Sequence, residues 1–362
     1  CISLLLSCCL AWLATASAKE STPAEKRQQL VSNVDTSLEG AQKYVLRVKG
    51  MPFYMTNIQV RLDLLRYSEG WDMELCDKLM AQIAADGFNT VSVPVHWYEV
   101  EPEKGKFDWT VLDSYLELVK KHGLKMEMLW FGANSGGHVQ WLGRPGKNAV
   151  HLRTPDYVLY SSSPSSKETT SEFTIRRDMS DYTLDIADDR LRERETYVLG
   201  KVMEHIAVWD MANGKQHPII GVQINNEFVG QRMAFPNSLA ISYLNSVAGA
   251  VKQSDYVVWT RANCVFWNVN GRIYENEAHR RSPEQTNLDF VGIDTYRHHF
   301  PSDASFIASM RNNLPYVEKN FRMIMETNSG IPVSAQMHLA ALSGNAAFDY
   351  YSCLLYTSDA AD

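Results

Sequence analysis

Short apolar runs and helical stripes alternate along the chain from residue 44 onward. Within each stripe the apolar residues recur three and four positions apart, which is the spacing of one helix face. Gly87 and Gly123 follow the first two stripes and suit helix ends. The two stripes consist of Cys76, Leu79, Met80 and Ile83, and of Leu112, Tyr115, Leu116 and Val119. The pattern predicts strands and helices in regular alternation.

Eight apolar runs have the length and the β-branched content of strands. They cover residues 52–60, 88–95, 124–131, 219–224, 257–265, 288–294, 321–326 and 346–351. Repeated strand–helix units with apolar strands favour a parallel sheet, and about 300 residues for eight units suit a (β/α)8 TIM barrel. We therefore predict an α/β TIM barrel over residues 44–352, with an open doubly wound sheet as the alternative.

A long polar segment interrupts this alternation between residues 134 and 189. A connection of that length inside a compact repeat is usually functional, so we predict an insertion after the third strand. No GxGxxG, Walker A or GxSxG sequence occurs in the 362 residues. The absence of these motifs argues against dinucleotide binding, P-loop chemistry and a nucleophile-elbow serine.

Composition narrows the classes of partner. Because 45% of the residues are hydrophobic, the chain has ample material for a core. The net charge is −7 and the sequence has no run of Lys and Arg, which argues against nucleic acid or an anionic membrane as the partner. Cys76, Cys264 and Cys353 are far apart and form no CxxC, which argues against a disulfide framework. We expect Cys76 and Cys264 to be buried free thiols.

The N-terminal residues 1–18 are predicted to be a secretory signal peptide. Residues 2–18 are apolar, too short to span a bilayer comfortably, and end in Ala16-Ser17-Ala18. A lipoprotein signal ending at Cys8 is the alternative, which would add a lipid anchor. The expected location is therefore the periplasm, the outer membrane or the extracellular medium. No later segment has the length of a transmembrane helix.

Two further segments are expected to lie outside the barrel. Residues 19–43 are polar and are predicted to be a linker. Residues 353–362 break the preceding pattern and resemble a translated adaptor sequence, so we interpret them as a non-native tail on a truncated C-terminus.

Candidate chemistry is sought where apolar strands end, because the working residues of a TIM barrel lie at the C-terminal ends of its strands. The fourth run is followed by Asn225-Asn226-Glu227 and the seventh ends in Glu326. Glu227 and Glu326 are 99 residues apart, three strand–helix units, so both can face one pocket. Retaining glycoside hydrolysis needs such a pair, one carboxylate as nucleophile and one protonated partner about 5–5.5 Å away.

Other polar and aromatic residues near strand ends are candidates for substrate binding. Asn226 offers an amide to a sugar hydroxyl, and Tyr296 offers its hydroxyl to Glu326. The remaining candidates are Trp97, Trp130, Trp267 and Asn134, with core packing as the alternative for each tryptophan. The histidines show neither an HxH at the first strand nor an HExxH, so we predict no metal.

The block from Gly87 to Trp97, followed by Glu101-Pro102 and Gly105 to Asp108, resembles the second-strand signature of clan A glycoside hydrolases. It is most similar to that of the β-galactosidases of families 35 and 42. The segment from Asn134 to Trp141 resembles instead a bacterial group related to family 35. The resemblance covers about residues 44–351.

This resemblance implies a retaining enzyme without a cofactor, in which Glu227 is the acid/base and Glu326 the nucleophile. The implied substrate is an oligosaccharide or polysaccharide, first a β-galactoside, with another β-glycoside left open. Two alternatives remain: a non-catalytic carbohydrate-binding protein on the same barrel, and a metal-dependent hydrolase. Carboxyl oxygens of Glu227 and Glu326 far more than about 10 Å apart would favour binding alone.

Overall fold

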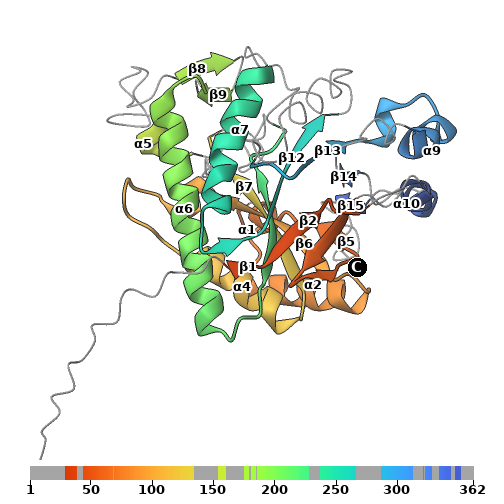
Figure 1. Ribbon diagram of the computed structural model, residues 1–362, viewed down its shortest axis with the longest axis horizontal. Coiled ribbons are helices and arrows are strands. Elements are labelled where there is room, and N and C mark those ends of the chain that lie inside the picture. The colour runs from red at the N-terminus through yellow and green to blue at the C-terminus, as the bar shows by residue number, and fades with distance from the viewer. Residues whose placement is uncertain are drawn as a thin grey trace, which may run out of the picture.

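The computed structural model describes most of the chain from residue 29 to residue 351 (Figure 1). The described residues are 29–38, 44–67, 69–133, 154–159, 175–178, 181–184, 186–227, 237–265, 287–312, 321, 323–327, 334–343 and 347–351.

Eight parallel strands close into a barrel, which confirms the predicted TIM-barrel fold. Their order around the barrel follows the chain, and the last strand pairs with the first. Each predicted apolar run contributes one of them: β5 (Thr56–Gln59), β6 (Thr90–His96), β7 (Lys125–Phe131), β10 (Ile219–Ile224), β12 (Trp259–Val265), β13 (Phe290–Asp294), β14 (Met323–Glu326) and β15 (Ala347–Tyr351).

Helices lie around the barrel, and the two predicted stripes form α2 and α4. Asp72 caps α2 by accepting a hydrogen bond from the amide of Leu75, which satisfies one of the free donors at a helix start. The helices are α1 (Leu62–Tyr67), α2 (Met73–Ala85), α3 (Trp97–Val100), α4 (Thr110–Lys121), α5 (Asp156–Leu159), α6 (Asp189–Ala212), α7 (Asn237–Lys252), α9 (Asp303–Asn312) and α10 (Ser334–Ser343), with a 3-10 turn η3 (Arg297–His299).

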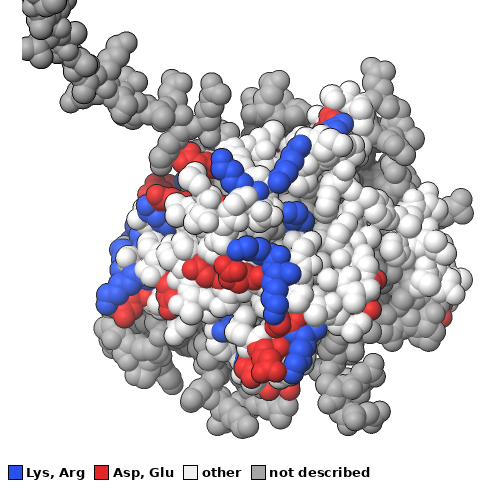
Figure 2. Space-filling model, turned by 90° about the horizontal axis from the view of Figure 1, so that it is seen from below, with Lys and Arg blue, Asp and Glu red and all other residues white. Residues whose placement is uncertain are grey.

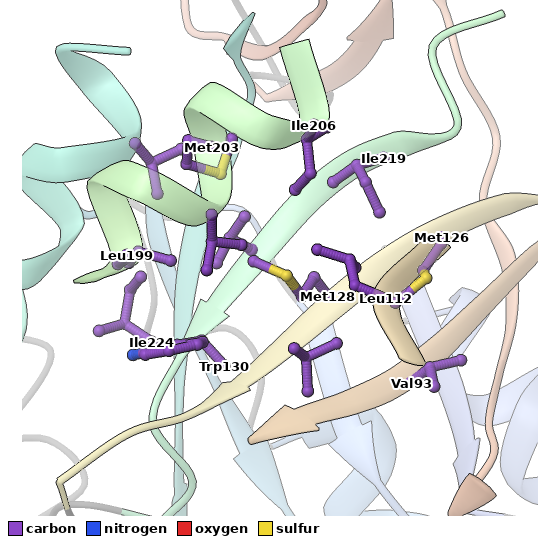
Figure 3. Close-up of a cluster of buried hydrophobic side chains, with 14 of the residues drawn as sticks. Val93, Leu112, Met126, Met128, Trp130, Leu199, Met203, Ile206, Ile219 and Ile224 are labelled. Carbon is purple, nitrogen blue, oxygen red and sulfur yellow. The ribbon is translucent and has the colours of Figure 1, made fainter. Parts of the chain in front are cut away.

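The main core lies between the strands and this helical layer. In Figure 3, Leu112 of α4 and Met203 and Ile206 of α6 are grouped with side chains of the neighbouring strands, such as Met128 and Ile219. All five are at most 1% exposed. Cys76, on the stripe of α2, is a buried free thiol, as predicted. The side chain of Cys264 lies outside the described residues.

The segment predicted as a linker carries structure in its second half. β1 (Gln29–Leu30) pairs with β11 (Tyr256–Val257), and β2 (Ser32–Asp35) forms an antiparallel sheet with β3 (Val45–Val48) and β4 (Met51–Pro52). Ser32 is buried and accepts a hydrogen bond from the Trp259 amide. This part of the chain is ordered by backbone pairing, which a polar composition does not reveal.

These N-terminal strands cover the end of the barrel where its strands begin. Leu46 and Val48 pack there with residues at or near strand starts, including Ile220, Trp259 and Phe290. The opposite end, where the strands finish, is therefore the end at which a site can open to solvent.

Two short strands, β8 (Ile175–Asp178) and β9 (Asp181–Leu184), form an antiparallel pair in the long segment between β7 and α6. None of the described helices is long and apolar enough to span a membrane. On the face seen in Figure 2, Lys and Arg lie beside Asp and Glu, so that face carries no large patch of one sign.

Candidate active site

Glu227 lies just beyond the C-terminal end of β10, at the open end of the barrel. The backbone is left-handed at Asn225 (φ 56°) and at Glu227 (φ 44°), a conformation that costs free energy for residues other than glycine. Asn225 is held by two hydrogen bonds, accepting from the Gly132 amide and donating to Glu195. The Glu227 amide donates to Asn263 Oδ1 at 2.8 Å. Neighbouring strands thus fix the turn that presents Glu227.

Glu326 is the last residue of β14 and lies at the same end. Its Oε1 accepts a hydrogen bond from Gln59 Nε2 at 3.2 Å, and its Oε2 accepts one from the Tyr296 hydroxyl. The hydrogen bond expected from the sequence between Tyr296 and Glu326 is therefore present. Two donors from different strands hold this carboxylate in one orientation.

The structure brings the two predicted glutamates together with a third carboxyl group, that of Asp294 on β13. One carboxylate oxygen of each residue lies within 4.8 Å of one from each of the other two. Glu227 is 8% exposed, Glu326 6% and Asp294 0%. The separation is far below the distance that would favour binding alone, and it is close to the spacing of a retaining pair, about 5–5.5 Å.

The surroundings of Glu326 act on its ionisation in opposite directions. On balance the pKa of the Glu326 carboxyl is raised, because burial outweighs the hydrogen bonds from Tyr296 and Gln59 and the charges of Arg61 and Arg261, which lower it. For Asp294, burial and the charges of Glu326 and Glu227 raise the pKa of its carboxyl well above the usual range, and they outweigh the charge of Arg261 and the hydrogen bond from Asn263, which lower it. The cluster therefore favours retaining at least one proton.

Asn226 and Asn263 form an amide chain behind Glu227. Asn226 Oδ1 accepts from Gln223 Nε2 at 3.1 Å and from Asn263 Nδ2 at 3.0 Å. No described residue accepts a hydrogen bond from the Asn226 amide nitrogen. The Asn226 NH2 group is thus oriented by its neighbours, and its donors are unused within the described part of the chain.

The predicted tryptophans are placed differently from the expectation. Trp97 and Trp130 are both 0% exposed, and their indole nitrogens donate to Glu101 and Glu195. Figure 3 shows Trp130 beside Ile224 and near Leu199, in the core between strands and helix. Neither ring can stack on a sugar, since each is enclosed by the layer outside the strands. Asn134 and Trp267 lie outside the described residues.

Four residues of the site were missed by sequence reasoning: Asp294, Asn263, Gln59 and Arg61. Asp294 ends the sixth apolar run, so the rule that selected the two glutamates also marks it. Gln59 and Asn263 are polar residues within strand runs, which is a weaker signal. Arg61 pairs with Asp63 through two hydrogen bonds of 2.8 and 2.7 Å, and nothing in its sequence context shows that it faces Glu326.

The spacing of the three carboxyl groups would also admit a cation, but their environment does not suit one. Both oxygens of Glu326 accept hydrogen bonds, from Gln59 and Tyr296, Asp294 Oδ2 accepts one from Asn263, and two arginine charges act on Glu326. A divalent cation favours carboxylates that are free of such donors and of positive neighbours. We assign no metal to this cluster.

A buried polar layer fills the barrel below the carboxyl cluster. Arg261 on β12 is fully buried, and its Nη2 lies 2.9 Å from Glu127 Oε2 and 3.5 Å from Asp349 Oδ2. Glu127 also accepts from the Trp259 indole at 2.7 Å. The guanidinium is the charge that compensates these interior acids.

Comparison with known proteins finds similarity to glycosidases. A family model described as "Beta-galactosidase", of glycoside hydrolase family 42, matches residues 66–148. A β-galactosidase of Halorubrum lacusprofundi is 24% identical over 161 residues, which are 42% of this chain and 20% of that protein. The chain resembles the family 42 β-galactosidases. This agrees with the resemblance stated from the sequence.

Solved structures share the fold. An exo-β-1,4-mannosidase from an Opitutaceae bacterium matches with a TM-score of 0.56 and 15% identity, over 83% of this chain and 52% of that one. Endo-glycoceramidase II from Rhodococcus sp. matches with a TM-score of 0.53 and 14% identity, over 84% and 74%. The chain thus spans about half the length of the mannosidase and a fifth of the β-galactosidase. The family match ends before Glu227 and Glu326, so their assignment rests on the geometry above.

Proposed function

We propose that the protein is a retaining glycoside hydrolase that cleaves a β-glycosidic bond in an oligosaccharide or polysaccharide. The observation that carries this proposal is the approach of Glu227 and Glu326 to within 4.8 Å at the open end of the barrel. The two side chains come from distant parts of the sequence and are each held in place by neighbouring strands. Such a pair is the chemical requirement of the retaining reaction.

In the proposed mechanism Glu326 is the nucleophile. Its ionised oxygen forms a bond to the anomeric carbon as Glu227 gives its proton to the leaving oxygen, so the glycosidic bond breaks and a glycosyl-enzyme ester remains. Glu227, now ionised, takes a proton from water, which attacks the same carbon and releases Glu326. Tyr296 and Gln59 stabilise the ionised form of Glu326 before and after each turnover.

Asn226 is the proposed contact to a sugar hydroxyl next to the reacting carbon, because its amide donors are unused by the described residues. The favoured substrate is a β-galactoside, since the matching family and the related Halorubrum protein carry that name. Another β-glycoside is the second candidate, because the similar structures include a mannosidase. We also propose that residues 1–18 direct export.

The test is azide rescue of two variants on aryl β-glycosides, after a screen of nitrophenyl glycosides has identified the sugar. Glu326→Gly is expected to lose at least about a thousandfold in kcat. Azide should restore turnover and yield the α-glycosyl azide, because the small anion enters the space vacated by the nucleophile.

Glu227→Ala is the matched variant. It keeps the nucleophile, so azide should attack the glycosyl-enzyme and yield the β-glycosyl azide. Opposite products from the two variants assign each role separately. Full activity in Glu326→Gly, or sugar binding by the unaltered protein without any turnover, would reject the enzyme proposal in favour of a carbohydrate-binding protein.

A further inference from the structure

The third carboxyl group of the site, that of Asp294, has no part in the two-glutamate mechanism. It is 0% exposed, and its Oδ2 accepts a hydrogen bond from Asn263 Nδ2 at 2.7 Å. Its Oδ1 is buried and has no hydrogen-bond partner among the described residues. An ionised carboxylate so placed would leave a charged oxygen without solvent and without a donor.

The positive charge of Arg261 lowers the pKa of Asp294, but burial and the charges of Glu326 and Glu227 outweigh it. Within the described part of the chain Asp294 belongs to no ion pair. The cation on the neighbouring strand β12, Arg261, is paired with Glu127 and Asp349. The other titratable groups that face it are Glu227 beyond β10, Glu326 on β14 and Tyr296 on its own strand end. Apart from Arg261, the titratable groups that act on Asp294 are thus acids and a tyrosine.

The proton count of the cluster follows from the reaction. The proposed mechanism needs one proton on Glu227 and none on Glu326. A charge on Asp294, within 4.8 Å of an oxygen of Glu326, would hinder the ionisation of Glu326 by about two and a half pH units at an effective dielectric of about 20. A substantial fraction of the nucleophile would then be protonated at neutral pH.

We propose that Asp294 is a neutral carboxylic acid and serves as a positioning residue that keeps Glu326 ionised by adding a dipole, not a charge, beside it. This inference rests on the proposed function. Asn263 supports this arrangement because one side chain contacts both acids. Its Nδ2 donates to Asp294 and to Asn226, and its Oδ1 accepts from the backbone amide of Glu227, the proposed acid/base.

The first measurement is an infrared spectrum of the full chain at neutral pH, with and without aspartate carrying 13C in its carboxyl group. The wild type should show the carbonyl band of a protonated carboxylic acid, and the label should shift that band. Asp294→Asn should remove it. Asp349→Asn is the matched control, because Asp349 is a second fully buried aspartic acid of the barrel interior, and burial raises the pKa of its carboxyl well above the usual range as well. That control should leave the Asp294 band in place.

The second measurement is the pH dependence of kcat/KM for Asp294→Asn. The amide is neutral and has the shape of the protonated acid, so both limbs of the profile should stay within about 0.3 pH units of the wild type. If Asp294 is ionised in the wild type, removing its charge should move both limbs down by about two and a half pH units. A shift of more than one pH unit overturns the proposal.

The spectrum needs no turnover and therefore separates the two proposals. A labelled acid band in a protein without glycosidase activity would reject the proposed function and retain the neutral Asp294. A wild-type spectrum without that band, or a labelled band of unchanged intensity in Asp294→Asn, overturns the neutral Asp294 whatever the activity. If Asp294→Asn does not fold, the spectrum of Asp349→Asn decides, because a labelled acid band that remains there does not come from Asp349.

Discussion

Two buried acidic sites lie near the open end of the barrel, and they are built in opposite ways. Glu195 of α6 is 0% exposed and accepts four hydrogen bonds. The donors are the Trp130 indole at 2.9 Å, the Ala133 amide at 3.1 Å, the Asn225 amide group at 2.9 Å and the Tyr243 hydroxyl at 2.6 Å. The carboxyl cluster places three acids together with fewer donors.

The difference shows that burial alone does not mark a functional carboxylate. Burial raises the pKa of both Glu195 and Glu326. At Glu195 four donors oppose that effect, and the residue joins β7, the end of β10 and α7. At the cluster the neighbouring acids add to it, notably for Asp294. A buried acid whose oxygens accept several hydrogen bonds, such as Glu195, stabilises the fold. Buried acids that lie close together with few donors instead favour a bound proton, which a catalytic site can use.

The largest effect is expected from Glu326→Gln, measured as both activity and stability. The amide cannot attack the anomeric carbon, so kcat should fall at least about a thousandfold. The midpoint of thermal unfolding should equal or exceed that of the wild type, because the cost of burying the Glu326 charge is removed. Glu117→Gln, on the exposed side of α4, is the control and should change neither quantity. A large loss of stability in Glu326→Gln would show that Glu326, like Glu195, stabilises the fold, and would contradict the difference drawn between the two.

The next effect is expected from Glu195→Ala, measured by denaturant unfolding. Four donors lose their acceptor in the interior, so the free energy of unfolding should fall by about 3 kcal/mol. Glu193→Ala on the same helix is the matched control, since Glu193 is exposed, and should change it by less than about 0.5 kcal/mol. Equal stability of the two variants would show that the hydrogen bonds of Glu195 do not hold the structure.

A smaller effect is expected from Tyr296→Phe, measured as the pH profile of kcat/KM. The Tyr296 hydroxyl lowers the pKa of Glu326 by donating to its ionised form, so its removal should raise that pKa. Because the nucleophile must be ionised, the acid limb should move to higher pH, and kcat should fall about tenfold to a hundredfold. Tyr54→Phe, which alters an exposed tyrosine, should leave the profile unchanged. An acid limb that stays in place would show that Tyr296 does not tune Glu326.

The smallest effect is expected from Asp294→Asn, measured as stability against pH. The folded state raises the pKa of Asp294, so it binds more protons than the unfolded state above about pH 4, and its contribution to stability is lost as pH rises. Between pH 5 and 7 the variant should therefore lose less stability than the wild type, by up to about 1.4 kcal/mol per pH unit. Asp303→Asn, at an exposed site, should show the same change in the free energy of unfolding per pH unit as the wild type. Parallel curves for the wild type and Asp294→Asn would contradict a raised pKa.

The sequence alone determined the barrel and the position of the two glutamates. All eight apolar runs became barrel strands, because their length and β-branched content specify buried parallel strands and the helical stripes cover them. The placement of Glu227 and Glu326 at one rim followed from the same pattern, since all strands of a parallel barrel end on the same side.

Only the tertiary structure decided which side chains share the pocket. Trp97 and Trp130 stand near strand ends like the glutamates, yet they point into the outer layer, where Glu101 and Glu195 accept their indole protons. Asp294 carries the same sequence signal as Glu326, and its role appears only when β13 and β14 lie side by side. A one-dimensional pattern specifies which residues end a strand. The closeness of charges across strands depends on register and on the direction of each side chain, which are set by packing.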